Sequence, residues 1–138
     1  MNIETVRDDG QVREFETGAS RGTKEGKLCY SGFFSPLVVR RVAEYMHKHR
    51  RMEDGSLREP DNWQKGMPVE EYMDSMWRHF FDVWANQRGW GEFVSSETDL
   101  EESLCALFFN VQGMLHEVIQ QNALDGVFEG LPGPDGAP

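Results

Sequence analysis

The sequence predicts an all-α protein built from three long helices. Three segments repeat apolar side chains at three- and four-residue spacing, which is the spacing of one face of an α-helix. No segment shows the alternating apolar and polar pattern of a half-buried strand. A length of 138 residues corresponds to one domain, or to one domain with tails. We therefore expect a helical bundle at residues 35–122, between an irregular N-terminal arm at 1–34 and a flexible tail at 123–138.

The first helix is predicted at residues 35–49. Ser35 followed by Pro36 is typical of an N-cap and a first helical position. One apolar and aromatic stripe then follows at helical spacing, made of Val38, Val42, Tyr45 and His49. The next segment, MEDGSLREPDNWQKG, is rich in turn-forming residues and predicts a loop.

The second helix is predicted at residues 68–87 and the third at residues 99–121. Pro68 opens the second helix, and Thr98 with Glu101 forms a capping box for the third. The apolar face of the second helix consists of Met73, Met76, Trp77, Phe80, Val83 and Trp84. The core-facing stripe expected on the third consists of Leu104, Leu107, Phe108, Val111, Leu115, Val118 and Ile119.

Three helices with such aromatic faces leave one side of a bundle open, because helical bundles normally close with four helices. Either a short extra helix from the N-terminal arm or a partner subunit can close it. We expect a second copy of the chain, and hence a homo-oligomer.

The charge distribution narrows the possible partners. Fourteen Lys and Arg residues against 24 Asp and Glu residues give a net charge of −10, and no Lys or Arg follows Arg88. An acidic C-terminal third repels a phosphate backbone, which disfavours nucleic-acid polymers as partners. No apolar run has the length of a membrane span, the N-terminus lacks a signal peptide's apolar stretch, and the two cysteines fit no disulfide framework. We expect a cytoplasmic protein that does not contact membranes.

Acidic pairs on two predicted helices are candidate metal ligands. Glu71 and Asp74 lie on one side of the second helix, and Asp99 and Glu102 lie one turn apart on the third. Helical bundles build divalent-metal sites from such carboxylates, and Mg²⁺ or Mn²⁺ fits oxygen ligands. The alternatives are a solvated acidic face and an ion-pair ladder through Arg78, formed by Asp74, Arg78 and Asp82.

Four further residues are candidate contacts for a phosphorylated ligand. Arg78 can clamp a phosphate with two hydrogen bonds, and His79 lies beside the same polar stripe. Lys27 belongs to the segment GTKEGKL, which imitates a phosphate-binding loop but lacks its glycine spacing and its hydroxyl residue. Asn110 interrupts an apolar run, so it either orients a ligand or satisfies a neighbouring backbone group.

Four segments together resemble a known family: EGKLCYSGF, DNWQKGMP, SMWRHFFDVW and DLEESLCALFFNVQG. They are similar, over about residues 13–120, to the dATP/dGTP diphosphohydrolase N-terminal domain family of phages and bacteria. Other members carry an HxxH pair on the last helix, where this chain has Asp99 and Glu102, and acids in that place favour a harder ion.

The resemblance implies hydrolysis of a purine deoxynucleoside triphosphate to monophosphate and pyrophosphate. This activity is similar to that of the all-α MazG-like pyrophosphohydrolases, whose carboxylates on neighbouring helices hold Mg²⁺. Their pattern is EExxE followed by ExxD, and this chain offers the similar Glu70-Glu71-x-x-Asp74 and Asp99-x-x-Glu102.

The working hypothesis is a Mg²⁺- or Mn²⁺-dependent nucleotide diphosphohydrolase, in the host cytoplasm if a phage encodes it. Glu71, Asp74 and Glu102 are the expected catalytic residues, and together with Asp99 they are the expected metal ligands. The expected substrate contacts are Lys27, Asn62, Trp63, Lys65, Arg78, His79 and Asn110, with Trp63 or Trp77 stacking on the base. The alternatives are a non-catalytic phage protein that sequesters a host signalling nucleotide, and a small helical adaptor without a ligand.

Overall fold

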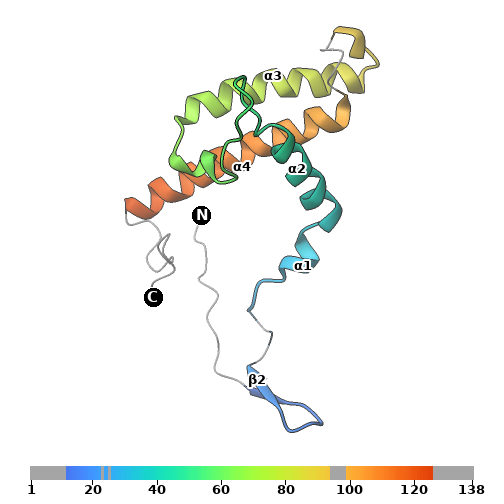
Figure 1. The fold of residues 1–138 in the computed structure, drawn as a ribbon. Coiled ribbons are helices and arrows are strands. Elements are labelled where there is room, and N and C mark those ends of the chain that lie inside the picture. The colour runs from blue at the N-terminus through green and yellow to red at the C-terminus, as the bar shows by residue number, and fades with distance from the viewer. Residues whose placement is uncertain (1–11, 23, 25, 94–98, 126–138) are drawn as a thin grey trace. The chain divides into compact units, whose positions relative to one another are not determined.

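Three long helices make up most of the structure, as predicted. The computed structural model describes residues 12–22, 24, 26–93 and 99–125. The elements are β1 (Val12–Glu14), β2 (Ser20–Gly22), α1 (Tyr30–Phe33), α2 (Pro36–Lys48), η1 (Asn62–Lys65), α3 (Val69–Gln87), η2 (Gly91–Phe93) and α4 (Leu100–Leu124) (Figure 1). They fall into two compact units, Met1–Val38 and Val39–Pro138. No helix of the described residues is long and apolar enough to cross a membrane.

The N-terminal unit contains a small antiparallel hairpin that the sequence did not predict. β1 and β2 pair from Val12 opposite Gly22 to Glu14 opposite Ser20. The turn is closed by the amide of Phe15, which donates to the carbonyl of Ala19 at 2.8 Å, and Gly18 supplies the positive φ of 83°. The strands are three residues long, which is too short for an alternating pattern to be visible in the sequence.

Local capping signals set the beginnings of α2 and α3. The Ser35 hydroxyl accepts a hydrogen bond from the amide of Val38 at 3.4 Å, at the predicted N-terminus of α2. Pro68, which the sequence predicted as the first helical residue, is the N-cap of α3, so that the helix begins one residue later, at Val69. Both helices match their predicted bounds of 35–49 and 68–87 within one residue at each end.

The beginning of α4 differs from the prediction. Its N-cap is Asp99, whose carboxylate accepts a hydrogen bond from the amide of Glu102 at 2.8 Å. The predicted cap, Thr98, lies outside the described residues. The helix continues to Leu124, beyond the predicted end at 121, and the predicted tail from residue 126 onward also lies outside the described residues.

Helices α3 and α4 run antiparallel and pack side by side (Figure 1). Small side chains of α4 are buried where the helices are packed: Ser103, Cys105, Ala106, Asn110 and Gly113. Tyr72 of α3 has a relative exposure of 0% and lies over Gly113. A Cβ atom on Gly113 would approach Cε1 of Tyr72 to 2.3 Å, so only glycine allows this contact. Tyr72 and Gly113 therefore fix the register of the two helices.

The predicted core face of α4 was wrong for the single chain. Six of its seven members are exposed: Leu104, Phe108, Val111, Leu115, Val118 and Ile119. Small residues let the backbones of α3 and α4 approach closely. The buried small side chains of α4, rather than its large apolar ones, therefore form the contact with α3. On α3, Met73, Trp77, Phe80 and Trp84 of the predicted apolar face are exposed as well.

Candidate functional site

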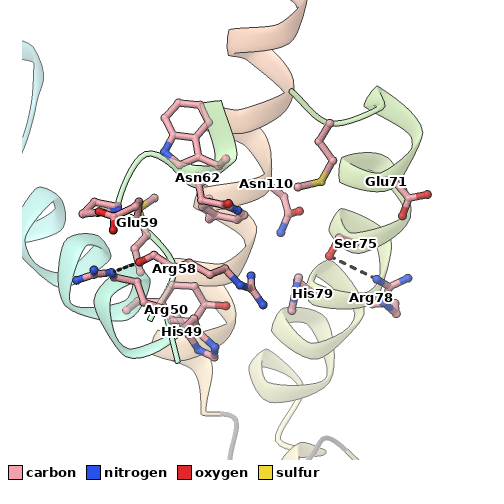
Figure 2. Close-up of a pocket in the computed structure, with 16 residues that line it drawn as sticks. His49, Arg50, Arg58, Glu59, Asn62, Glu71, Ser75, Arg78, His79 and Asn110 are labelled. Atoms are coloured by element: carbon pink, nitrogen blue, oxygen red, sulfur yellow. Dashed lines mark hydrogen bonds between the residues drawn. The ribbon is translucent and has the colours of Figure 1, made fainter. Parts of the chain in front are cut away.

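One pocket gathers polar side chains from α2, the following loop, η1, α3 and α4. Its volume is about 430 Å³. Figure 2 shows its lining, which consists of Tyr45, Met46, His49, Arg50, Arg58, Glu59, Pro60, Asn62, Trp63, Met67, Glu71, Ser75, Arg78, His79, Phe109 and Asn110. All of these residues belong to the C-terminal unit.

A small hairpin in the loop after α2 positions two arginines of the pocket. The amide of Arg58 donates to the carbonyl of Arg50 at 2.9 Å, and Nε of Arg50 donates back to the carbonyl of Arg58 at 2.6 Å. Asp54 and Gly55 form the turn between them, where Gly55 has a φ of 84°. Neither arginine was predicted from the sequence to be a site residue. The Asp-Gly dipeptide, a typical hairpin turn, is the signal that can reveal them.

None of the three guanidinium groups of the pocket has a carboxylate partner among the described residues, and that of Arg50 is held by the carbonyl of Arg58, which leaves Arg58 and Arg78. Figure 2 shows the Arg58 side chain extending from the loop into the space between α2 and α3. Arg78 donates a long hydrogen bond of 3.4 Å to the Ser75 hydroxyl. The alternative ion-pair ladder of Arg78 with Asp74 and Asp82 is not formed, although Asp82 lies near enough to influence His79. These two positive charges are therefore available to an anionic ligand.

His79 faces the same pocket from α3 and is held uncharged near neutral pH. Burial lowers its pKa below the ordinary value of 6.5; Asp82 opposes this shift, whereas the neighbouring Arg78 and His49 side chains add to it. Its Nδ1 is buried and has no hydrogen-bond partner among the described groups. A neutral imidazole at this position can donate to or accept from a ligand.

Aromatic and amide groups form the opposite wall. Trp63 of η1 is half-buried and meets His116 of α4 edge to face, with ring centroids 4.9 Å apart. Asn110 is buried, and its amide nitrogen donates to the carbonyl of Ala106 at 2.8 Å. Asn110 therefore satisfies a backbone group of its own helix and also lines the pocket. The backbone alternative raised by the sequence is therefore confirmed, and the orientation of a ligand by Asn110 stays a prediction.

The structure does not bring the four predicted metal ligands together. Glu71 precedes Tyr72, which lies over Gly113, and Gly113 lies eleven positions after Glu102 on α4. That separation is roughly 16 Å along the helix axis. Figure 2 shows Glu71 at the outer edge of the pocket, and Asp74 is not part of its lining. Among the residues described here, no group of three or more His, Cys, Asp or Glu side chains is arranged to hold a metal ion.

The two carboxylates at the start of α4 have other partners. Asp99 caps the helix. Glu102 accepts from the Arg41 guanidinium at 2.8 Å and from Lys48 at 3.5 Å, and Arg41 also binds Glu101. The hydrogen bond from Arg41 lowers the pKa of Glu102. This cluster joins α2 to α4 and is already neutralised by its own cations.

Two predicted substrate contacts are not among the residues that line the pocket. Lys65 is exposed at the end of η1 and does not line the pocket. Lys27 belongs to the N-terminal unit, where its amide donates to the carbonyl of Lys24 at 3.1 Å. The structure does bring together six other predicted residues around one cavity: Asn62, Trp63, Glu71, Arg78, His79 and Asn110.

Comparison with known proteins adds no relative to this description. No family model, no curated protein and no solved structure matches the chain. The resemblance drawn from the four sequence segments therefore stays a prediction. The evidence for a function comes from the residues that line the pocket.

Proposed function

We propose that this protein binds a nucleotide in the pocket between α2, α3 and α4. The observation that carries the proposal is the pair of guanidinium groups, Arg58 and Arg78, that no described carboxylate neutralises. Phosphate oxygens accept from guanidinium groups in paired, charge-assisted hydrogen bonds, which are stronger than neutral ones.

The rest of the lining supports a base and a sugar beside the phosphates. Trp63, Tyr45 and Phe109 supply aromatic surface, and a base stacks on such rings. Asn62 and Asn110 supply amide groups that can orient a polar edge. The volume of about 430 Å³ lies within the range of small-molecule sites. Sequestration of a nucleotide without turnover is the reading that this set of groups supports best.

Hydrolysis of a purine deoxynucleoside triphosphate is the second candidate. It is favoured by two carboxylates, Glu59 and Glu71, that line the same pocket as the arginines. A Mg²⁺ or Mn²⁺ ion that arrives with the nucleotide can bridge one such carboxylate to phosphate oxygens. The two candidates share the binding step and differ in whether pyrophosphate is released.

Calorimetric titration of the full chain with dATP, dGTP, ATP and GTP, each with Mg²⁺, tests the proposal. Arg58→Ala and Arg78→Ala are each expected to weaken binding about 10- to 100-fold, because a lost charged hydrogen bond costs about 1.5–3 kcal/mol. Arg40→Ala is the matched control, since Arg40 is exposed outside the pocket and pairs with Glu44 at 3.0 Å. Its affinity should equal that of the wild type.

Absence of binding by every nucleotide, or equal affinities in all three variants, would contradict the proposal. Pyrophosphate assayed in the same samples separates the two candidates. Tight binding without release supports sequestration, and release that is lost in Glu71→Gln supports hydrolysis.

A further inference from the structure

A continuous row of exposed apolar side chains follows each of the helices α3 and α4. On α3 the row consists of Met73, Trp77, Phe80, Phe81 and Trp84, and on α4 it consists of Leu104, Phe108, Val111, Leu115, Val118 and Ile119. Trp77 is 67% exposed and Leu115 is 56% exposed. We refer to these eleven residues as the apolar face. Soluble proteins rarely leave a patch of this kind in water unless it binds something.

Most of the apolar face is directed away from the pocket, and Phe81, three positions after the pocket residue Arg78, is its member nearest to the lining. Residues two positions apart point about 200° away from each other around an α-helix. On α3, Ser75 and His79 line the pocket, and Trp77 lies two positions from both. On α4, Phe109 lines the pocket and Val111 is two positions away. An occupant of the apolar face would therefore leave the pocket open.

The charge of the apolar face indicates the chemistry of its occupant. Residues 103–116 of α4 contain no Asp, Glu, Lys or Arg. A basic protein partner would be recognised by acidic groups within the surface that it covers, and this part of α4 has none. This uncharged stretch of α4 can instead meet the same stretch of a second copy without bringing like charges together, even in a chain of net charge −10; the α3 row, by contrast, is interspersed with Asp74, Arg78 and Asp82.

The size of the apolar face also matches a stable dimer. A large side chain has roughly 150–250 Å² of surface that can be buried. With the observed exposed fractions, the eleven side chains of the apolar face together expose roughly 1,000 Å² per copy. Stable protein interfaces bury about 800 Å² per partner. A face of this size is sufficient without contributions from other parts of the chain.

We infer that the apolar face binds a second copy of the chain. Two antiparallel α3–α4 pairs then form a four-helix bundle around a two-fold axis, with the large apolar side chains as its core. The two pockets face away from each other on opposite sides of the assembly. The inference does not depend on nucleotide binding.

Light scattering and sedimentation of the full wild-type chain give the first test. We expect a dimer at micromolar concentration. If the measured mass at about 50 µM protein is that of a monomer, the inference is overturned. That result is expected if the N-terminal unit covers the face within one chain, or if the face binds a different protein.

Variants locate the interface. Trp77→Glu and Leu115→Glu each place a charge in the apolar face and should convert the dimer to a monomer with unchanged helical circular dichroism. Leu57→Glu adds the same charge at an apolar side chain that is 50% exposed in the loop after α2, and it should remain dimeric. If a glutamate variant unfolds, Trp77→Ala and Leu115→Ala should weaken dimerisation at least tenfold. A dimer that all of these variants retain overturns the assigned surface.

Discussion

Two clusters of positive charge lie close together in this protein. Carboxylates neutralise the first cluster, whereas the second has no carboxylate partner among the described residues. At the start of α4, the guanidinium of Arg41 binds Glu101 and Glu102. In the neighbouring pocket, the guanidinium groups of Arg58 and Arg78 bind no described carboxylate. His49 belongs to both clusters, because it lines the pocket and its Nε2 lies 3.9 Å from Oε2 of Glu102.

The difference separates a structural role from a ligand-binding role. A guanidinium that is already neutralised joins two helices, and little of its charge and hydrogen-bonding capacity remains for an anionic ligand. A guanidinium that is partly solvated and unpaired retains its hydrogen-bonding capacity for a ligand. Counting arginines in the sequence cannot make this distinction, since it depends on which carboxylates the fold brings within reach.

The largest expected effect concerns the helix register that keeps the acidic pairs apart. Gly113→Ala places a Cβ atom 2.3 Å from Cε1 of the fully buried Tyr72, whose ring is held in place by the α3–α4 contact. We expect a loss of roughly 3 kcal/mol in the free energy of unfolding, the upper range for overpacking. Chemical denaturation measures it, and Gln120→Ala on the exposed surface of α4 serves as the control. A loss below 0.5 kcal/mol, a small surface-type effect, would show that the register does not depend on this contact.

The bounds of α2 and α3 could be read from the sequence, but the buried face of α4 could not. Ser35, Pro36 and Pro68 are local signals, and α2 and α3 begin within one residue of the positions that they indicate. The buried face of α4 is selected by Tyr72 and Gly113, which are far apart in the chain. Nothing local to either residue announces that contact.

The candidate site was predictable to a similar extent. Arg78 and His79 lie on one helix, so their spacing alone places them near each other. The amide groups of Asn62 and Asn110 join them only because η1 and α4 fold onto the same side as α3. Arg58 enters the pocket because a hairpin pairs it with Arg50, and this pairing is visible only through its Asp-Gly turn. The predicted four-carboxylate group failed because antiparallel packing separates its two halves.

A smaller effect is expected when the neutralised cluster loses its central carboxylate. Glu102→Gln leaves Arg41 and Lys48 without this charge, so the protein should be destabilised by about 1 kcal/mol once screening by solvent is taken into account. The pKa of Glu102 is lowered in the folded state, so its contribution is present above the ordinary value of 4.5 and is lost as the pH falls below it. Denaturation at pH 7 and at pH 3 measures both. A difference between wild type and variant that persists unchanged at pH 3 would contradict this account. Nucleotide affinity should not change.

The smallest effect concerns His79, where the pocket and protein stability are linked through a proton. Burial lowers the pKa of His79 below 6.5 in the folded state, so the unfolded chain binds this proton more readily. Stability from this group is therefore complete above about pH 6.5 and decreases as the pH falls through that value toward the lower folded pKa.

The free energy of unfolding should accordingly decline between pH 7.5 and pH 5.5 less steeply in His79→Gln than in the wild type. His47→Gln is the control, because His47 is exposed near the end of α2 and does not line the pocket. Nucleotide affinity gives the opposite sign, since protonated His79 adds a positive charge beside Arg58 and Arg78. Bound phosphate should raise the pKa of His79, and lowering the pH should strengthen binding in the wild type but not in His79→Gln. Identical pH profiles for both proteins, in stability and in affinity, would place His79 outside the ligand's reach.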